Sequence, residues 1–441
     1  MKYAHTPKIG PLQGVKVAFS GISIAGPFAA ELMAEWGADV IWLENPKAPD
    51  IARGGFGTSG ECERRNMRTM SIDYLCDEGR EVFKKLIANV DIFLESTKGK
   101  HFEKIGYSDE YLWSINPKLV IIHLSGFGQT GLDEFVTRGS YDPIAQAFSG
   151  LMQLQGYPGD EYPPQPAHMS VADYLAALHA TVGGLAALNR TLDTGKGESV
   201  DVCQYECALR CQAQRPGEYW NYGVKPFREG YLNKTAACWG IFETSDNRSI
   251  YIIGLGVSPL KILCKLLGFT YGEGDIPEGT IYINRYETET GKIFQERWIE
   301  YCKTHTAQEI EDALLPHGVT CSKVNNYEDL LNDEGLLEHG TLFTGTTADG
   351  RDYVQPCIAP RFKKNPTWVW RPMPGIGADN NDILRDLGYT THEIKELYEK
   401  KVIVRKPPVQ ITKEVSDAII KSYGYGEDQM LYLEKPLNYD I

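Results

Sequence analysis

The sequence predicts an α/β protein with a large Rossmann-like domain, built on a mostly parallel sheet, and a smaller α+β domain. Short apolar segments rich in branched residues alternate with helical segments over the first half of the chain, as in parallel sheets covered on both faces. This alternation breaks near residue 215, and a hairpin pattern follows near residue 239. With 441 residues, the chain is long enough for both cores.

The first half is expected to begin with a strand over 15–20, whose apolar and branched residues suit a buried sheet. Pro27 is expected to start a helix, because proline is tolerated in the first helical turn. The further elements expected here are strand 39–44, helix 78–89, strand 91–94, a short helical stretch after Lys100, strand 119–124, helix 171–192 and strand 199–203.

The second half is expected to leave the large domain and return to it. Proline, glycine and aromatic residues mix over 215–240, which predicts a crossing segment. A hairpin over 239–255, helices over 259–267 and 307–315 and a strand over 319–324 are expected next, before an extended Pro-rich return and a helix over 379–387. The predicted boundaries are 1–215 for the first part of the large domain, 216–238 for a linker, 239–335 for the small domain and 336–441 for the return linker and the C-terminal part of the large domain.

The composition excludes some classes of function. The formal net charge of −14 argues against a nucleic-acid-binding protein, which needs a basic surface. The polar first residues lack the apolar core of a signal peptide, and no run of ~18 apolar residues predicts a membrane span. The 10 scattered cysteines are typical of reduced thiols, so we expect a cytoplasmic protein. Cys203, Cys207 and Cys211 recur at helical spacing, which indicates helix packing rather than metal ligation.

The loop over 20–27 joins a strand to a helix, where backbone N–H groups can face an anion. It contains only Gly21 and Gly26, so it is not the G-x-G-x-x-G fingerprint. Glu44 ends the second strand, where a dinucleotide fold places a ribose-binding acid. A simple tight turn is the competing interpretation of this loop.

Asp173 stands at the head of the helix expected over 171–192. With Ser170 it forms a Ser-x-x-Asp pattern similar to a capping box, so one interpretation is that it only complements the helix dipole. The other is a carboxylate nucleophile that the helix N-terminus keeps ionised and that splits an acyl transfer into easier steps. The small neighbours Ala172, Ala176 and Ala177 would let a bulky ligand or another backbone approach closely.

A glycine-containing loop over 125–131 directly follows a predicted strand. Its N–H groups would be able to hold a developing oxyanion, although a plain turn explains the glycines equally well. Cations also stand next to predicted strands, where they would be able to meet phosphates or simply be solvated. These cations are Lys98, Lys100 and Lys104 after one strand and Arg64, Arg65 and Arg68 before another.

These segments occur together in an order that resembles the class III CoA-transferases, the family of formyl-CoA transferase and carnitine CoA-transferase. The resemblance runs from about Pro11 to Leu397. The segments that carry it are PLQGVKVAFSGISIAGPFAAELMAEWGADVIWLEN, RRNMRTMSID, DEGREVFKKL, NPKLVIIHLSGFGQTG, SYDPIAQAFSG, VADYLAAL and TGKGESVDVCQYE. The carnitine, or γ-butyrobetainyl-CoA, branch is the most similar, through FSGISIAGPFA, AEWGADVIW, IPEG near Ile276 and KNPTWVWRPMP. The bile-acid CoA-transferases share several of these features, including TRGSYD and QAFSG.

The resemblance implies that Asp173 is the active-site aspartate and that Lys98 and Lys104 contact CoA. It implies covalent catalysis, in which an aspartyl anhydride and then an aspartyl-CoA thioester form. Acyl-CoA and a small carboxylic acid would be the partners, with CoA thioesters as substrates and neither a metal nor a permanently bound cofactor. It also implies a homodimer of two interlocked subunits.

Three alternatives differ from this prediction. An α-methylacyl-CoA racemase resembles the same fold but needs a histidine for proton transfer, and the matching stretch here, Gly139-Ser-Tyr-Asp142, has none. A Rossmann oxidoreductase would need the missing glycine fingerprint. A binding protein without catalysis would not require Asp173.

The substrate prediction follows from the resemblance to the carnitine branch, and aromatic residues of this sequence are compatible with it. A carnitine-type acid carries a quaternary ammonium group, which aromatic faces attract. Tyr219, Trp220, Tyr222 and Tyr231, with Glu218 nearby, would be able to supply such faces, to line an apolar pocket for a bile acid, or to pack at an interface. We therefore expect carnitine or γ-butyrobetaine-type acids, with a bile acid or a 2-hydroxy acid as the alternative.

Overall fold

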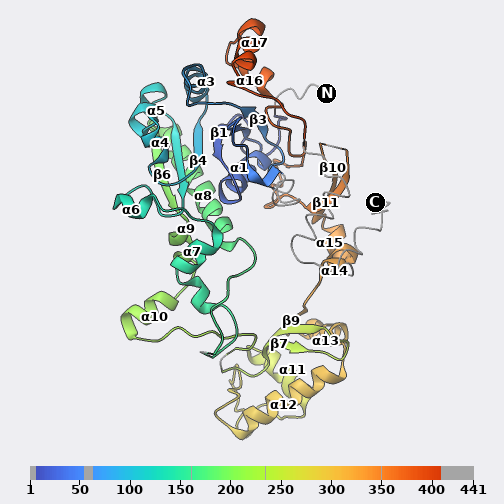
Figure 1. Cartoon of the computed structure of the whole chain (residues 1–441). Coiled ribbons are helices and arrows are strands. Elements are labelled where there is room, and N and C mark those ends of the chain that lie inside the picture. Colours follow the sequence, from blue (N-terminus) through green and yellow to red (C-terminus); the bar gives the residue numbers. More distant parts are fainter. Residues whose placement is uncertain (1–5, 54–62, 160, 234, 349, 409–441) are drawn as a thin grey trace. The chain divides into compact units, whose positions relative to one another are not determined.

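The computed structural model describes residues 6–53, 63–159, 161–233, 235–348 and 350–408 (Figure 1). The chain forms two compact units. Of the described residues, those within 6–149, 167–213 and 340–408 make up the first unit, and those within 150–166 and 214–339 make up the second. Relative to the predicted boundaries, segment 150–166 lies in the second unit. Arg228 gives the reason, because its guanidinium donates hydrogen bonds to the carbonyls of Tyr157, Gly159 and Tyr162.

The first unit is built on a six-stranded sheet, and all five strand pairs are parallel. The strand order is β3-β2-β1-β4-β5-β6. The strands are β1 (Lys16–Gly21), β2 (Asp39–Glu44), β3 (Arg68–Ser71), β4 (Ile92–Ser96), β5 (Val120–Ser125) and β6 (Glu198–Cys203). The predicted α/β class with a Rossmann-like parallel sheet is therefore confirmed.

Helices cover both faces of this sheet because its buried strands are apolar on both sides. Val17 and Phe19 of β1 pack on one face with α1 and α8, and Ala18 packs on the other face with α3 and α5. The helices of the first unit are α1 (Ala25–Glu35), α3 (Asp77–Ile87), α4 (His101–Lys104), α5 (Asp109–Ile115), α6 (Asp133–Val136), α7 (Asp142–Phe148), α8 (Val171–Thr194), α9 (Gln204–Arg210), α16 (Asn380–Asp386) and α17 (Thr391–Glu399), with the 3-10 turn η1 (Ile51–Arg53).

Helix α8 is long and apolar enough to cross a membrane, judged by length and composition alone. Half of its most apolar stretch is buried inside the fold. Ala176, Ala177 and Ala180 are fully buried in the same cluster as Val120 and Ile122 of β5. The helix therefore packs as a core helix of the sheet, and its alanines allow that close approach.

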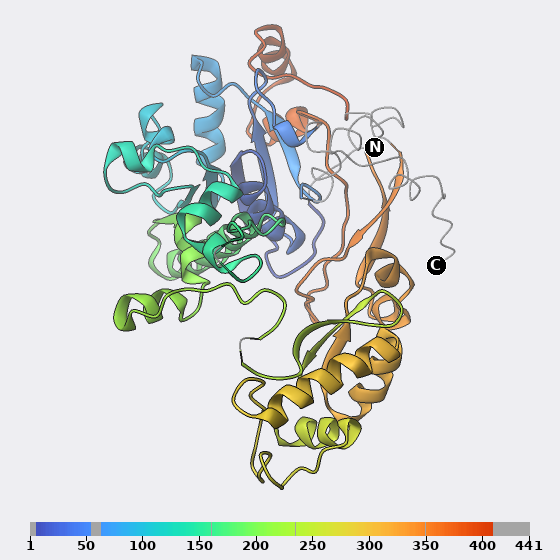
Figure 2. The same cartoon turned by 60° about the horizontal axis from the view of Figure 1, so that its bottom comes forward.

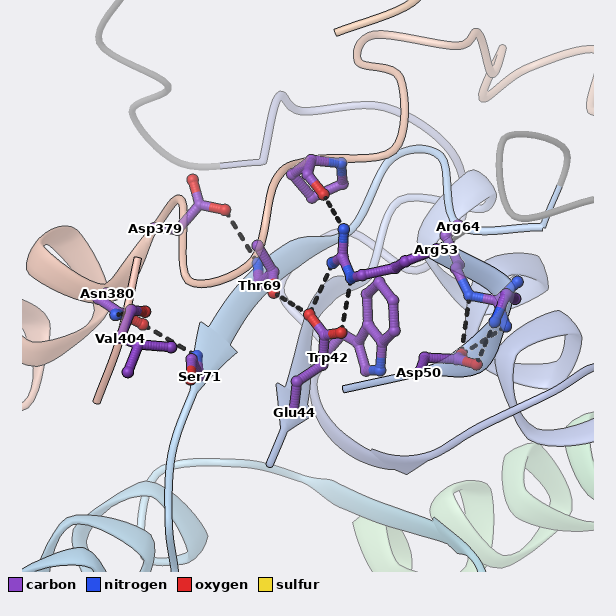
Figure 3. Close-up of polar contacts among 12 residues, drawn as sticks. Trp42, Glu44, Asp50, Arg53, Arg64, Thr69, Ser71, Asp379, Asn380 and Val404 are labelled. Atoms are coloured by element: carbon purple, nitrogen blue, oxygen red, sulfur yellow. Dashed lines mark hydrogen bonds and ion pairs between the residues drawn. The ribbon is translucent and has the colours of Figure 1, made fainter. Parts of the chain in front are cut away.

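The returning C-terminal segment completes the edge of the sheet. The Asp379 carboxylate accepts a hydrogen bond from the Thr69 backbone N–H (2.9 Å), and the Asn380 side-chain oxygen accepts one from the Ser71 N–H (2.9 Å) (Figure 3). Both donors lie on β3, an edge strand whose N–H groups would otherwise lack partners. The chain after residue 340 thus packs in the first unit, and it also includes a hairpin of β10 (Leu342–Thr346) and β11 (Asp352–Pro356).

The second unit contains a three-stranded antiparallel sheet, β7-β8-β9, against which the gold helix α12 lies in Figure 2. The predicted hairpin is confirmed as β7 (Trp239–Glu243) and β8 (Ser249–Ile253), and the third strand is β9 (Thr320–Lys323). The helices of this unit are α10 (Arg215–Tyr222), α11 (Val257–Leu267), α12 (Glu289–Thr304), α13 (Ala307–Leu314), α14 (Tyr327–Asn332) and α15 (Glu334–Glu338), with the 3-10 turns η2 (Leu151–Leu154) and η3 (Leu315–His317). The sequence did not predict α10, α12, α14 or α15.

Candidate active site

A pocket of about 670 Å³ opens at the carboxyl ends of the parallel strands. Gly21 ends β1, Ser96 ends β4, and both residues line it. In the order β3-β2-β1-β4-β5-β6, the chain reverses its winding between β1 and β4, and open α/β sheets bind ligands at this switch point. The volume is that of a small-molecule site. Sheet topology therefore places the pocket.

One wall of the pocket is the predicted loop between β1 and α1. Gly26 is required there, because a Cβ atom at this position would lie 2.4 Å from the Cβ of Ser96. Ser23 has a φ of 71°, which side chains rarely adopt. The Asp50 carboxylate accepts from its N–H (3.2 Å), and Arg64 donates to its carbonyl oxygen. Side chains from outside the loop, those of Asp50 and Arg64, thus stabilise its conformation.

The Arg64–Asp50 ion pair (2.6 Å) that holds this loop is fully buried. Arg53 and Arg64 lie 4.3 and 5.5 Å from the centre of the Trp42 ring, and Figure 3 shows both guanidinium groups beside the indole. Arg53 also donates to both carboxylate oxygens of Glu44 at 2.6 Å. Glu44 therefore lines the pocket with both carboxylate oxygens engaged by Arg53, and a role in holding a ribose stays a hypothesis.

Asp173 lies in the first turn of α8 and lines the pocket, with 5% of its surface exposed. Ser170 makes no side-chain cap. Instead, the Asp142 carboxylate from α7 accepts hydrogen bonds from the N–H groups of Ala172 (2.7 Å) and Asp173 (3.4 Å). The expected Ser-x-x-Asp cap is therefore wrong, because a residue remote in sequence takes the role and leaves the Asp173 carboxylate in the pocket wall.

Burial, the neighbouring carboxylate of Asp142 and that of Glu63 raise the pKa of Asp173 to about 7. A hydrogen bond from the Gln204 side-chain amide to Asp173 Oδ1 opposes this rise. The helix N-terminus therefore does not hold the pKa of Asp173 at or below its usual value. Asp142 occupies the helical N–H groups, and desolvation disfavours the charged carboxylate.

The basic residues have different fates. Lys98, which follows β4, lines the pocket. His101 and Arg138 also line it, although the sequence did not indicate either residue as a site residue. Lys104, at the end of α4, is exposed and is not among the residues that line the pocket. Lys100 pairs with Asp133 (2.6 Å).

The three arginines just before and at the start of β3 are each buried in an ion pair. Arg64 pairs with Asp50 (2.6 Å), Arg65 with Glu35 (2.6 Å), and the Arg68 Nε donates to Asp39 (2.8 Å). The ion pairs support neither of the two interpretations offered for these arginines, contact with phosphates or simple solvation. The local sequence around a group of basic residues does not predict which acidic side chains will pair with them in the folded protein.

The loop over 125–131 contributes Ser125 and Gly126 to the pocket wall. Two of its N–H groups are already used, since Gly128 donates to the Ser125 hydroxyl (2.8 Å) and Gln129 donates to the Asp201 carboxylate (2.8 Å). The N–H groups of Gly128 and Gln129 would have to break these hydrogen bonds before they were able to bind an oxyanion. Of the two interpretations of the loop, the structure therefore favours a tight turn.

The predicted aromatic cluster lies in the second unit. Tyr219, Trp220, Tyr222 and Tyr231 are each more than half exposed. The role of these aromatic faces in binding a substrate therefore stays a prediction.

Comparisons with known proteins agree with this architecture. Residues 12–380 match the CoA-transferase family III. A CAIB/BAIF family protein from Brucella suis superimposes with a TM-score of 0.71 and 24% sequence identity, over 86% of this chain and 100% of that one. The Rv3272 protein of Mycobacterium tuberculosis superimposes with a TM-score of 0.71 and 21% identity, over 86% of this chain and 100% of that one. At these identities the two structures support the fold. Because the family match spans most of its length, the chain belongs to CoA-transferase family III and is a CoA-transferase.

Proposed function

We propose that this enzyme transfers CoA from an acyl-CoA to carnitine or γ-butyrobetaine-type acids, and that Asp173 carries the covalent intermediates. The observation that carries the role of Asp173 is its position, since it is a buried carboxylate in the wall of the pocket at the sheet's switch point. Lys98 lines the same pocket and offers a cation to an anionic CoA.

The proposed reaction begins when Asp173 Oδ2 attacks the donor thioester. The carbon–sulfur bond breaks, and a mixed anhydride and CoA thiolate result. The thiolate then attacks Cγ of Asp173, breaks the Cγ–Oδ2 bond and releases the donor acid, which leaves an aspartyl-CoA thioester. The acceptor carboxylate attacks Cγ and expels the thiolate, which finally attacks the acceptor's acyl carbon and regenerates Asp173 as a carboxylate.

The direct test is to trap these intermediates. Hydroxylamine added during turnover converts an aspartyl anhydride or thioester into a hydroxamate, which peptide mass spectrometry locates. We expect a hydroxamate on Asp173 that requires an acyl-CoA. The absence of any modification at Asp173 during active turnover would overturn its proposed role.

The substrate is tested by a panel of acyl-CoA donors and acceptor acids. The resemblance to the carnitine branch favours betaine acids, so CoA exchange is expected to be fastest with them. Exchange only with a bile acid or a 2-hydroxy acid would replace the carnitine proposal. Stereoinversion of an acyl-CoA without exchange would support racemase activity instead.

The pH dependence of transfer is expected to follow Asp173. Its carboxyl group must be ionised to attack, and its pKa is raised to about 7. We therefore expect kcat/KM for the acyl-CoA to be constant above this pKa and to fall roughly tenfold per pH unit below it. Measurement from pH 5 to 9 checks the prediction, and a flat profile down to pH 5 would contradict it.

Removal of the Lys98 charge is expected to weaken acyl-CoA binding. A hydrogen bond to a charged phosphate contributes enough that Lys98→Ala is expected to raise KM about tenfold, with a smaller effect on kcat. Lys104→Ala is the matched control, because Lys104 is also basic but does not line the pocket. Equal KM increases in both variants would indicate a general field effect and argue against a local contact.

The sequence-based expectations of a homodimer, a cytoplasmic location and catalysis without a resident cofactor are also part of this proposal. Light scattering of the purified protein tests the dimer. Turnover by extensively dialysed enzyme tests the cofactor expectation.

A further inference from the structure

We propose that Gln204 is a second catalytic residue, whose side-chain amide donates a hydrogen bond to the acyl oxygen of Asp173 during CoA transfer. This inference rests on the proposed covalent role of Asp173. It assigns a function to a residue that the sequence pattern did not single out.

Gln204 is placed by the sheet. Strand β6 pairs with β5 so that Cys203 lies opposite Ser125, and Gln204 follows directly as the first residue of α9. Its side chain thus starts at the carboxyl edge of the sheet. Gln204 is 5% exposed, lines the pocket with Asp173, and donates from Nε2 to Asp173 Oδ1.

This hydrogen bond distinguishes the two carboxylate oxygens. Because Oδ1 is held by Gln204, Oδ2 is the oxygen that attacks the donor thioester and later leaves with the donor acid. Oδ1 stays bonded to Cγ through the whole sequence. When the thiolate and then the acceptor carboxylate add to Cγ, the negative charge of each tetrahedral state develops on Oδ1, where the amide already points.

Three backbone donors of the neighbouring loop and helix already have partners. The N–H groups of Gly128 and Gln129 have partners within their own unit, and Asp142 accepts from the Ala172 N–H. A neutral amide also suits this position. It donates a hydrogen bond to Oδ1 but carries no positive charge that would form an ion pair with the attacking carboxylate. The charged neighbours of Asp173, Asp142 on α7 and Glu63 ahead of β3, both oppose its ionisation, whereas Gln204 favours it.

The test replaces Gln204 by methionine, which keeps the side-chain length and removes the donor. We expect kcat for CoA transfer to fall about a hundredfold, which is the effect of losing one oxyanion donor. We also expect the midpoint of the pH–rate profile to move to higher pH, because the hydrogen bond that favours the carboxylate is gone. Gln212→Met is the matched control, since the Gln212 amide is also buried but donates to the Ser149 carbonyl (2.8 Å).

Hydroxylamine trapping in the unaltered enzyme separates this inference from the role of Asp173. If a hydroxamate forms on Asp173 but Gln204→Met keeps the normal kcat, the inference is wrong. It is also wrong if kcat falls with an unchanged pH midpoint, as a packing defect would give. Should Gln204→Met not fold, Gln204→Glu keeps the shape, and the added negative charge is expected to move the midpoint higher still.

Discussion

Replacement of Asp173 by alanine is expected to abolish CoA transfer while the protein stays folded. Without the carboxylate neither the anhydride nor the thioester can form, so the covalent route is closed. The residual rate is expected to be at least about 10⁴-fold below that of the unaltered enzyme, the scale seen when a nucleophile is removed. A radiolabelled-acid exchange assay is sensitive enough to measure this loss.

Stability is expected to be preserved in this variant because the buried carboxylate does not stabilise the fold at neutral pH. Its folded-state pKa, about 7, lies above the ordinary value of 3.8 that the unfolded chain has, so ionisation above pH 3.8 favours unfolding. The melting temperature of Asp173→Ala is therefore expected to equal or exceed the original. Asp193→Ala, at the exposed C-terminal end of the same helix, is the control and is expected to keep full activity. Transfer at more than a trace rate by Asp173→Ala would contradict the mechanism.

Replacement of Arg64 by methionine is expected to cause the second large effect, a loss of stability. Arg64 and Asp50 are both fully buried, so the substitution leaves a carboxylate in the interior without its cation. The free energy of unfolding is expected to fall by about 3–5 kcal/mol. Urea denaturation of the whole chain measures the change, and activity is expected to fall with it because the Ser23 loop loses a donor.

A double variant isolates the cause of this loss. Asp50→Asn keeps a side-chain oxygen that can accept from the N–H groups of Ser23 and Ala52, as Asp50 Oδ1 does now at 3.2 and 3.0 Å. Combined with Arg64→Met, it removes the unpaired charge, so the double variant is expected to be more stable than Arg64→Met alone. If the double variant is no more stable than the single one, the loss comes from packing rather than from the buried charge.

The positions of most strands and of the long helix were predictable because their signals are local. Strands β1, β2, β4 and β5 are short apolar segments buried on both faces, and such segments need no distant information. Helix α12 was missed because charged residues surround its few buried side chains, such as Phe294 and Trp298. Its apolar stripe is too narrow for a single-sequence pattern to reveal.

The candidate site was predictable only in part. Asp173 and Lys98 were selected through resemblance to a family, and the fold brings both to one pocket. His101 and Arg138 also line that pocket, yet nothing in the local sequence of either residue marks it. The order of the strands in the sheet decides which loops lie next to one another. This order cannot be predicted from the sequence of any single loop.

The sequence by itself determined the α/β class, the family and the residue expected to form the covalent bond, because these follow from local periodicity and from motifs. Tertiary structure alone decided that Asp142 caps the helix of Asp173 and that Gln204 donates to the Asp173 carboxylate. It also decided that Arg64 forms a buried ion pair with Asp50. The physical reason is that hydrogen bonds and ion pairs depend on distance in space. In this protein the partners that set the charge of Asp173 lie about thirty residues or more away along the chain.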